Sequence, residues 1–540
     1  MVAFALFRGL VASLAVVSVT AHPKNVTLPL LLDATLDELA AGLRKGLFTS
    51  VDLVDAYIAR IEEVNPILNA VTEINPDARD IAKELDEERK CGRSRGPLHG
   101  IPIMIKNNIA TADKMNNTAG SYALLGAKVP RDATVAAKLR KAGVVILGKA
   151  NLSQWANFRS ANSSNGWSAH GEQVYAAYYP GLDPSGSSSG SGVVPSIGLA
   201  LAALGTETDG SIVSPAQANN VVGIKPTVGL TSRSLVIPIS EHQDTVGPMA
   251  RTVKDAAYIL QAIAGRDAND NYTSAIPFRK LPNYVKACRK NALKGKRIGV
   301  PRNSISNTPA DAPVLAAFNA ALEIMEEAGA TIVENTNYTA WEQRLNSSAE
   351  TIVLYADFVV NLKQYLDQLT YNPNNVTTLA EVRAFTQNFT LEEYPSRDTL
   401  IWDEALELGF NNTSPEAWAA YQENQFIGGE GGILGALERY SLDAVVVPTN
   451  DAAGISAIIG GPVITVPLGA YPEDTPVTTN RRGNLNATAP GVPFGISFAG
   501  KLWSEEMLVG LAYAFEQRTK VREKVKPYIL PTTELVDVLG

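Results

Sequence analysis

Residues 183–214 carry two small clusters of glycine and serine, and an apolar segment of helical length separates the clusters. The stretch reads DPSGSSSGSGVVPSIGLALAALGTETDGSIVS. This spacing can bring Ser211 of the second cluster back beside Ser187 of the first. The glycines next to both serines would let backbone N–H groups come close to a reacting carbonyl. A flexible loop rich in glycine and serine has the same composition, so the rest of the chain has to decide between the two interpretations.

Segments of helical length alternate with short apolar runs along the chain, which is the pattern of an α/β fold with helices on the faces of a sheet. Ser50 and Asp132 are the expected N-caps of two of the helices. The helices expected in the first half of the chain are 36–45, 50–64, 77–91, 132–141 and the buried segment 191–203. The expected strands are 69–74, 101–105, 144–147, 221–225, 297–300, 444–447 and 463–466.

Region 310–440 differs from the rest, because it reads as long helices such as 313–328 and 350–369. Pro313 suits a first helical turn, where its missing N–H costs nothing. We expect this region to be a helical insertion or cap over the sheet, within a single domain that spans 22–540. The stretch 472–493, rich in Pro, Gly and Asn, is expected to be a loop.

The first 21 residues read as a secretory signal peptide. An apolar run extends over 9–19, and the small residues before Ala21 form a cleavage site. The run is too short for a membrane anchor and is followed at once by His22, Pro23 and Lys24. We therefore expect secretion, and many Asn-x-Ser/Thr sequons are consistent with an exposed, glycosylated surface. The sequons begin at Asn25, Asn116, Asn151, Asn162, Asn271, Asn337, Asn346, Asn375, Asn388, Asn411, Asn412 and Asn486.

Charge and motif content exclude several classes of function. The net charge of −8 provides no basic footprint for nucleic acid, and no basic run indicates an anionic membrane surface. Metal-binding spacing and nucleotide-binding motifs are absent from the sequence. The two cysteines, Cys91 and Cys288, cannot form a disulfide framework; whether they form one disulfide is open.

Histidine is scarce, so a base other than histidine is needed for hydrolysis. The four histidines, at positions 22, 99, 170 and 242, are not accompanied by a G-x-S-x-G motif. Lys106 follows the apolar run IPIMI and is expected at the C-terminal end of a buried strand. A free lysine has a pKa of about 10.4. Burial would lower the pKa and favour the neutral, basic form, although a lysine at a strand edge can also simply face water.

Several segments of the chain, in order, resemble the amidase signature family over nearly all of the sequence after residue 21. The segments are GIPIMIKNNI, DATVAAKLRKAGVVILGKANLSQWA, GSSSGSG, GTETDGSI, VVGIKPTVGLTSR, QDTVGPMARTVKDAA, GGPVITVPLG and GVPFGISFAG. One segment alone would be a weak signal, but this many in the same order are a strong one. The resemblance implies the amidase signature fold, a large mixed β-sheet covered by helices on both faces. It also implies amide hydrolysis without a metal or other cofactor.

The resemblance assigns a Ser–Ser–Lys triad to three positions of this chain. Ser211 matches the acylated nucleophile, Ser187 the bridging serine and Lys106 the base. The family's bridging serine follows a cis peptide bond, which would be the bond between residues 186 and 187. Around the nucleophile, the N–H groups of Thr208, Asp209, Gly210 and Ser211 would hold the oxyanion, and Ser160 and Ala161 would touch substrate.

The chain departs from the common family pattern at several positions. Asp209 stands where the common core has glycine, and a carboxylate there would oppose the charge that develops on the oxyanion. We expect its side chain to turn away and to hydrogen bond to backbone or a nearby serine. Glu207, Asn107, Ser189 and Val213 also differ from the common pattern. The variants GSSSGSG and ETDGS resemble a branch that includes peptide-amide hydrolases, so we do not interpret them as inactivation.

The sequence therefore predicts a secreted amide hydrolase that acts on a small-molecule or peptide amide. Two alternatives remain open: a non-catalytic secreted binding protein with the same fold, and an esterase that uses the same triad. Ammonia release from glutamine in a tRNA-modifying complex, another function of the family, is disfavoured by the expected signal peptide and the acidic composition. No partner nucleic acid and no stable membrane insertion are expected, and the sequence does not indicate an oligomeric state.

Overall fold

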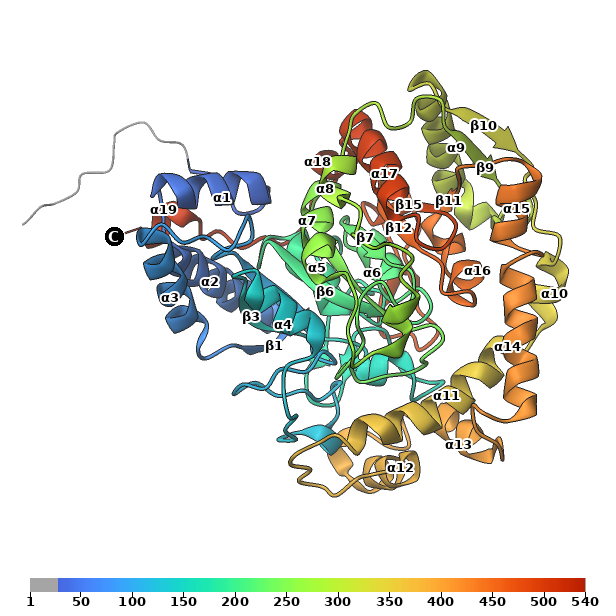
Figure 1. The fold of residues 1–540 in the computed structure, drawn as a ribbon, viewed down its shortest axis with the longest axis horizontal. Helices are drawn as coiled ribbons and strands as arrows, with labels where there is room; N and C mark the ends of the chain where they lie inside the picture. The colour runs from blue at the N-terminus through green and yellow to red at the C-terminus, as the bar shows by residue number, and fades with distance from the viewer. Residues whose placement is uncertain (1–27, 540) are drawn as a thin grey trace, which may run out of the picture.

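The computed structural model describes residues 28–539, and its centre is one mixed β-sheet of 11 strands (Figure 1). The strand order is β1-β3-β2-β6-β8-β7-β12-β15-β11-β9-β10. Parallel pairs join β2 to β3 and β6, and also join β9 to β10 and β11, whereas the middle of the sheet is antiparallel. Every residue of the central strands β2, β6 and β8 is buried. Because successive side chains point to opposite faces, helices must cover both faces. The predicted α/β fold is thus confirmed.

The elements have the following bounds. The strands are β1 (Val71–Ile74), β2 (Pro102–Lys106), β3 (Val145–Ala150), β4 (Trp167–Ser168), β5 (Glu172–Gln173), β6 (Ala202–Glu207), β7 (Val222–Lys225), β8 (Thr245–Ala250), β9 (Arg297–Val300), β10 (Thr331–Glu334), β11 (Ala444–Pro448), β12 (Val463–Ala470), β13 (Thr478–Thr479), β14 (Asn486–Thr488) and β15 (Pro493–Ala499). The helices are α1 (Leu36–Lys45), α2 (Ser50–Leu68), α3 (Ala78–Lys90), α4 (Thr134–Lys141), α5 (Ser189–Ser196), α6 (Val213–Ala218), α7 (Val253–Ile263), α8 (Tyr284–Ala287), α9 (Ala312–Glu327), α10 (Trp341–Asn346), α11 (Ala349–Leu366), α12 (Leu379–Asn388), α13 (Leu400–Glu407), α14 (Pro415–Gly428), α15 (Ile433–Arg439), α16 (Ala453–Ala457), α17 (Glu505–Thr519), α18 (Val521–Lys524) and α19 (Leu535–Val538).

The buried helix predicted over 191–203 is wrong in its second half. Helix α5 ends at Ser196, and β6 already begins at Ala202. Gly198 takes a left-handed φ of 69° between them, which ends the helix. A short buried strand is apolar at every position, so hydrophobic periodicity alone does not separate it from a buried helix.

Two predicted N-caps are also wrong. The N-cap of α2 is Thr49, whose hydroxyl accepts a hydrogen bond from the N–H of Asp52, and Ser50 lies inside the helix. Helix α4 has no side-chain cap, because the Asp132 carboxylate instead accepts from the N–H of Ala112 and pairs with Arg140. Residues of capping type are thus used here for contacts between distant segments.

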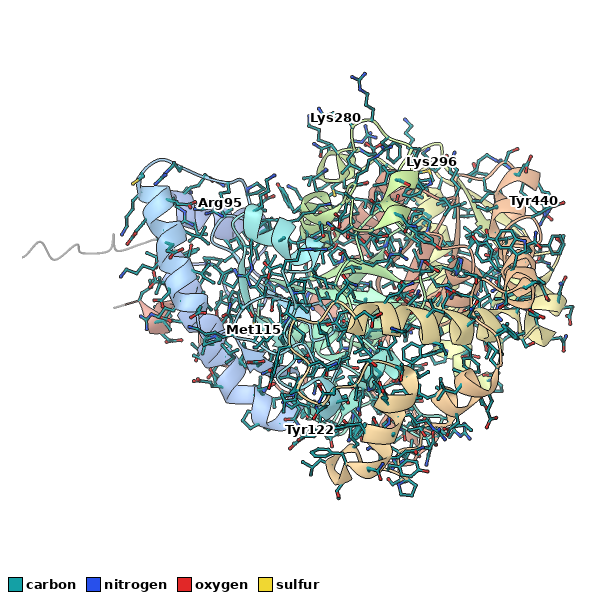
Figure 2. All side chains as sticks on the ribbon, turned by 60° about the horizontal axis from the view of Figure 1, so that its bottom comes forward. Arg95, Met115, Tyr122, Lys280, Lys296 and Tyr440 are labelled. Carbon is teal, nitrogen blue, oxygen red and sulfur yellow. The ribbon has the colours of Figure 1, made fainter. Side chains whose placement is uncertain are left out.

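Region 310–440 contributes both to the sheet and to a helical layer beside it. Strand β10 extends the sheet at its edge beside β9, and helix α9 connects these two strands. Helices α10 to α15 then run along the right and lower sides of the view in Figure 1. Tyr122, labelled in Figure 2, lies against this layer, and its ring centroid is 5.2 Å from that of Phe389 just after α12.

The stretch 472–493, predicted to be a loop, contains only the short strand pair β13–β14 before β15 begins. Cys91 and Cys288 are both free thiols, which settles the question that the sequence left open. None of the helices between residues 28 and 539 combines the length and the apolar character needed to cross a bilayer. The predicted signal peptide and the sequon at Asn25 lie outside the described residues.

Candidate active site

Lys106 ends strand β2 and is completely buried. Strands β2 and β6 are parallel, with Ile105 opposite Leu204, so their carboxyl ends meet at the same edge of the sheet. The Lys106 Nζ lies 2.8 Å from Ser187 Oγ, 2.9 Å from Ser188 Oγ and 2.8 Å from Thr206 Oγ1. The hydrogen bonds around this amine therefore come from uncharged groups. Among the described residues, no carboxylate forms an ion pair with Lys106.

The burial of Lys106 changes its acid–base chemistry. Removal from water lowers the pKa of this amine to about 7, while the negative charges of Asp244 and Glu207 act in the opposite direction. At neutral pH a substantial fraction of Lys106 is therefore uncharged, and a neutral amine has a lone pair that can accept a proton. Lys106 thus has the property that a general base needs.

The GSSSG cluster forms the turn that leads into α5. The peptide bond between Gly186 and Ser187 is cis, as the resemblance implied, and Ser187 is fully buried. The turn packs closely against β1 and β3. A Cβ atom on Gly190 would lie 2.2 Å from the carbonyl oxygen of Ala70, so only glycine fits there.

Ser211 lies in the loop between β6 and α6, and the carboxylate of Glu207 organises this loop. Glu207 accepts hydrogen bonds from the N–H groups of Gly210 (3.0 Å), Ile212 (2.6 Å) and Val213 (2.9 Å). The glutamate that replaces the common aspartate thus has a structural role. Because the N–H of Gly210 is taken by Glu207, it is not available to an oxyanion. The N–H groups of Thr208, Asp209 and Ser211 donate to no acceptor within residues 28–539.

The two serine clusters meet through the backbone. The N–H of Ser188 donates to the carbonyl oxygen of Ser211 over 3.2 Å. In the described part of the chain, no hydrogen bond joins the hydroxyls of Ser187 and Ser211. Ser211 is 8 % exposed, whereas Ser187 and Lys106 are completely buried. Ser211 is therefore the member of the set that an incoming molecule can reach.

Asp209 does not make the hydrogen bond that we predicted: among the described residues its carboxylate has no donor. Its side chain is partly exposed to solvent, but the surrounding protein atoms limit the access of water to its carboxyl. Restricted access to water raises the pKa of this carboxyl, and the like charges of Glu350 and Glu207 raise it further. Asp209 therefore keeps its proton to a higher pH than an ordinary aspartate and carries less charge beside Ser211.

Ser160 and Ala161 lie in a surface loop that is tied to the helical layer. The N–H of Ala161 donates to Asp398, and the hydroxyl of Ser160 accepts from the N–H of Asn162. No hydrogen bond among the described residues joins either of them to Lys106, Ser187 or Ser211. A side-chain hydrogen bond thus joins Lys106 to Ser187, and the backbone of Ser211 is bonded to the same serine cluster, whereas contact of Ser160 and Ala161 with substrate stays a prediction.

Three groups around Lys106 were not predicted from the sequence. Ser188 and Thr206 hold the amine, and Asp244 hydrogen bonds to Thr208 of the loop that carries Ser211. Ser188 and Thr206 sit directly beside the two serine clusters, so their neighbourhood was visible in the sequence. Asp244 is distant in sequence, and no local signal would have placed it here.

Within the described residues, one group of side chains has the character of metal ligands. Ligand atoms of Glu241, His242 and Asp357 lie within 4.8 Å of one another. The Asp357 carboxylate, however, already receives hydrogen bonds from Ser240, His242 and Asn412. These hydrogen bonds connect the loop before β8 to helix α11, and this structural role explains why the three side chains lie together.

Comparison with known proteins places these features in a wider context. The sequence profile of the amidase family matches residues 52–509. A relative from Arthroderma benhamiae, provisionally named an amidase, is 58 % identical over 97 % of this chain and 92 % of its own length. The solved structure of native peptide amidase from Stenotrophomonas maltophilia is 38 % identical and superimposes with a TM-score of 0.82 over 93 % of this chain and 99 % of that one. A second solved structure, that of a peptide amidase in complex with the competitive inhibitor chymostatin, is also 38 % identical and superimposes with a TM-score of 0.82.

Proposed function

The chain belongs to the amidase family, and on that premise we propose that it hydrolyses a carboxamide C–N bond through an acyl-enzyme on Ser211. The observation that carries the proposal is the position of the fully buried Lys106 amine, 2.8 Å from Ser187 Oγ. The residue after Ser187 donates its N–H to the carbonyl oxygen of Ser211, so the same turn contacts both Lys106 and the Ser211 loop. The activity itself, amide hydrolysis, follows from the family and from relatives that are named amidases. The roles of the individual residues are our proposal.

In the proposed acylation step, Ser211 Oγ attacks the amide carbon as its proton passes to Ser187. Ser187 in turn gives its own proton to the neutral amine of Lys106. This transfer requires the hydroxyls of Ser211 and Ser187 to approach each other, because no hydrogen bond joins the two hydroxyls within residues 28–539. Catalytic hydrogen bonds that are long in a free enzyme commonly tighten when substrate binds.

The tetrahedral intermediate carries a negative charge on the former carbonyl oxygen. The unoccupied N–H groups of Thr208, Asp209 and Ser211 are available to hold that charge. The partial protonation of Asp209 reduces the repulsion that a carboxylate would exert there. The C–N bond then breaks, and the proton returns from Lys106 through Ser187 to the leaving amine. Water subsequently attacks the ester carbonyl of the acyl-enzyme, and the same relay accepts the proton of the water. The bond between the acyl carbon and Ser211 Oγ then breaks, the proton returns from Lys106 through Ser187 to Ser211 Oγ, and the carboxylic acid leaves.

The proposed relay predicts a specific pH dependence. Lys106 acts as a base only when it is neutral, so the rate of acylation should rise with pH through about 7, the pKa of this amine. Below that pH the rate should fall about tenfold per unit, since the neutral fraction falls in that proportion. Single-turnover kinetics from pH 5 to 9 measure this directly. An acylation rate that stays level down to pH 5 would contradict the relay.

We also propose that the substrate is a small-molecule or peptide amide. The support is the similarity to structures of peptide amidase, one of which is a complex with the competitive inhibitor chymostatin. An esterase activity would use the same residues, and a matched pair of ester and amide substrates would reveal the preference.

The last part of the proposal is that the protein is secreted after removal of residues 1–21. Its support is the apolar run with a small-residue cleavage site in the sequence. We expect protein recovered from the culture medium of a eukaryotic host to begin at His22 and to carry glycans on some of its sequons. Mass spectrometry of the N-terminal peptide checks this expectation. Full-length protein that is retained in the cells would contradict it.

A further inference from the structure

Asp244 precedes strand β8 and connects two segments of the site. Its carboxylate accepts hydrogen bonds from the Thr208 hydroxyl (2.6 Å) and from the N–H groups of Ile239 (2.8 Å) and Ser240 (3.1 Å). Thr208 belongs to the loop that carries Ser211, and its own N–H is free to bind an oxyanion. Asp244 therefore holds the side chain of a residue whose backbone faces the reaction.

A small cavity of about 10 Å³ lies between Asp244 and the support of Lys106. Asn108, Thr206, Thr208 and Asp244 line it. This volume has room for about a single water molecule. The Oδ1 atom of Asn108 is buried in the structure without a hydrogen-bond partner, as expected for a group that faces such a polar cavity. Thr206 lies on the same cavity and directly contacts the Lys106 amine.

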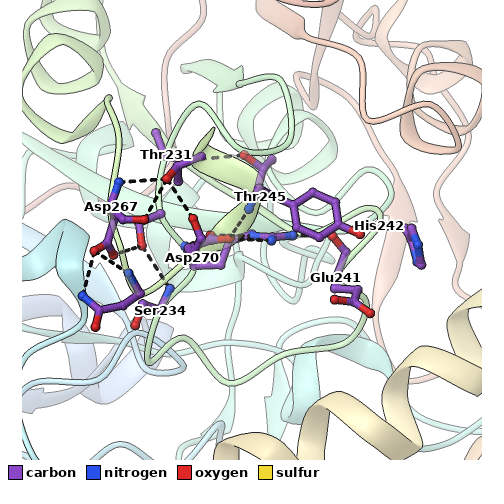
Figure 3. A network of polar contacts seen from close by, with 12 residues as sticks. Thr231, Ser234, Glu241, His242, Thr245, Asp267 and Asp270 are labelled. Atoms are coloured by element: carbon purple, nitrogen blue, oxygen red, sulfur yellow. Dashed lines mark hydrogen bonds and ion pairs between the residues drawn. The ribbon is translucent and has the colours of Figure 1, made fainter. Parts of the chain in front are cut away.

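The loop that carries Asp244 is anchored on its far side. Arg233 forms an ion pair with Asp270 at 2.8 Å and donates to the carbonyl oxygen of Glu241. Figure 3 shows this polar network, with Asp267 and Asp270 on one side and Glu241 and His242 at the other end. Helix α11 adds a second anchor, because Asp357 pairs with His242 and Asn361 accepts the N–H of Glu241. The position of Asp244 is thus fixed by elements outside the triad.

The charges near Lys106 are few. Asp244 and Glu207 are the carboxylates whose charges raise the pKa of Lys106 against the effect of burial. Glu207 is committed to three backbone N–H groups of the Ser211 loop. Burial raises the pKa of Asp244 itself to about 6, while the charge of Arg233, which is already paired with Asp270, acts in the opposite direction. Asp244 is therefore the carboxylate near Lys106 that can be altered without dismantling the Ser211 loop.

We propose that Asp244 is a positioning residue of the reaction: it orients Thr208 for oxyanion binding and places a negative charge across a one-water cavity from Thr206, the residue that holds the Lys106 amine. This inference rests on the proposed function. It predicts two separable effects, one on the geometry of the loop and one on the pH at which Lys106 becomes a base. A purely structural role for Asp244 would not move that pH.

The test measures the rate at which a fluorophosphonate probe labels Ser211 from pH 5 to 9. On the acid side of the pH profile, which we call the acid limb, the labelling rate falls as Lys106 becomes protonated. In Asp244→Asn, loss of the negative charge should shift the midpoint of this limb to lower pH by about half a pH unit or more. Labelling at pH 9 should also slow by about tenfold, because an oxyanion donor is misplaced. In Thr208→Val the Asp244 carboxyl remains, although it loses a hydrogen bond that lowers its pKa, a value that burial already raises to about 6. Labelling at pH 9 should therefore slow, while the fall in rate toward acid pH should shift less than in Asp244→Asn. Thr208→Ser keeps the hydroxyl and should label at nearly the wild-type rate.

Two results would overturn the inference: an acid limb of Asp244→Asn that superimposes on that of the wild type, or a Thr208→Val variant that labels as fast as Thr208→Ser. If thermal unfolding shows that Asp244→Asn does not fold, the labelling rates of Thr208→Val and Thr208→Ser still test whether the hydrogen bond from Thr208 to Asp244 orients the loop. Failure of wild-type protein to label at Ser211 would instead contradict the proposed function, so the two failures are distinguishable.

Discussion

Replacement of Ser211 by alanine is expected to reduce amide turnover by at least about 10⁴-fold. The variant lacks the oxygen that forms the acyl-enzyme, and removal of the nucleophile from a comparable catalytic unit costs about 10⁶-fold in kcat. The Ser211 hydroxyl makes no hydrogen bond to another described residue, so the free energy of unfolding should change little. Steady-state kinetics and thermal unfolding on the same preparation separate the two effects.

Ser214 provides the matched control for this variant. It lies three residues further along in α6, and its hydroxyl likewise makes no side-chain hydrogen bond among the described residues. Ser214→Ala should keep turnover within about threefold of the wild type, since the removed hydroxyl makes no hydrogen bond among the described residues and takes no part in the proposed relay. Residual turnover of Ser211→Ala comparable to that of Ser214→Ala would refute the assignment of the nucleophile.

Replacement of Lys106 by methionine is the second change with a large expected effect. Methionine has a similar length but no proton acceptor of comparable basicity, and loss of a general base costs about 10²–10⁴-fold in rate. The Ser187 hydroxyl would also lose the one hydrogen-bond partner that it has among the described residues, and a buried group left unsatisfied costs roughly 1–3 kcal/mol of stability. Turnover should therefore be compared per folded molecule, after thermal unfolding shows what fraction is native.

Lys149 offers a close control, because it is also a fully buried lysine on the neighbouring strand β3. Burial lowers the pKa of Lys149 to about 7 as well, yet its Nζ donates to the Ile109 carbonyl (2.6 Å) and the Asn117 side chain (2.7 Å), not to a serine. Lys149→Met should lose stability but keep turnover per folded molecule. Equal losses of turnover in the two variants would show that burial alone, rather than the contact with Ser187, accounts for the effect.

The fold was predictable from the sequence where periodicity and length agree. The helices 36–45 and 77–91 and the strand 297–300 lie within one residue of their predicted bounds. Prediction failed at β6, whose continuous apolar character matches either a strand or a buried helix. It also failed at Asp132, whose carboxylate binds a distant N–H rather than a helix end.

The candidate site was predictable to the extent that its residues lie in recognisable local motifs. Lys106, Ser187 and Ser211 each sit in such a motif. The parallel pairing of β2 and β6 brings Lys106 and the loop of Ser211 to the same edge of the sheet, where Ser187 contacts Lys106 from the turn before α5. The contacts of Asp244 with Thr208 and of Glu207 with the Ser211 loop depend on tertiary packing. The failed expectation for Asp209 has the same origin, since its surroundings include Glu350 from the distant helix α11.

The assignment of Ser211 as the nucleophile is tested most directly by mass spectrometry of wild-type protein trapped with a fluorophosphonate at pH 8, followed by peptide mapping. The account predicts one added group per molecule, located on Ser211, and no addition to Ser187 or Ser188. A label on any other residue, or intact protein that gains no mass, would contradict it.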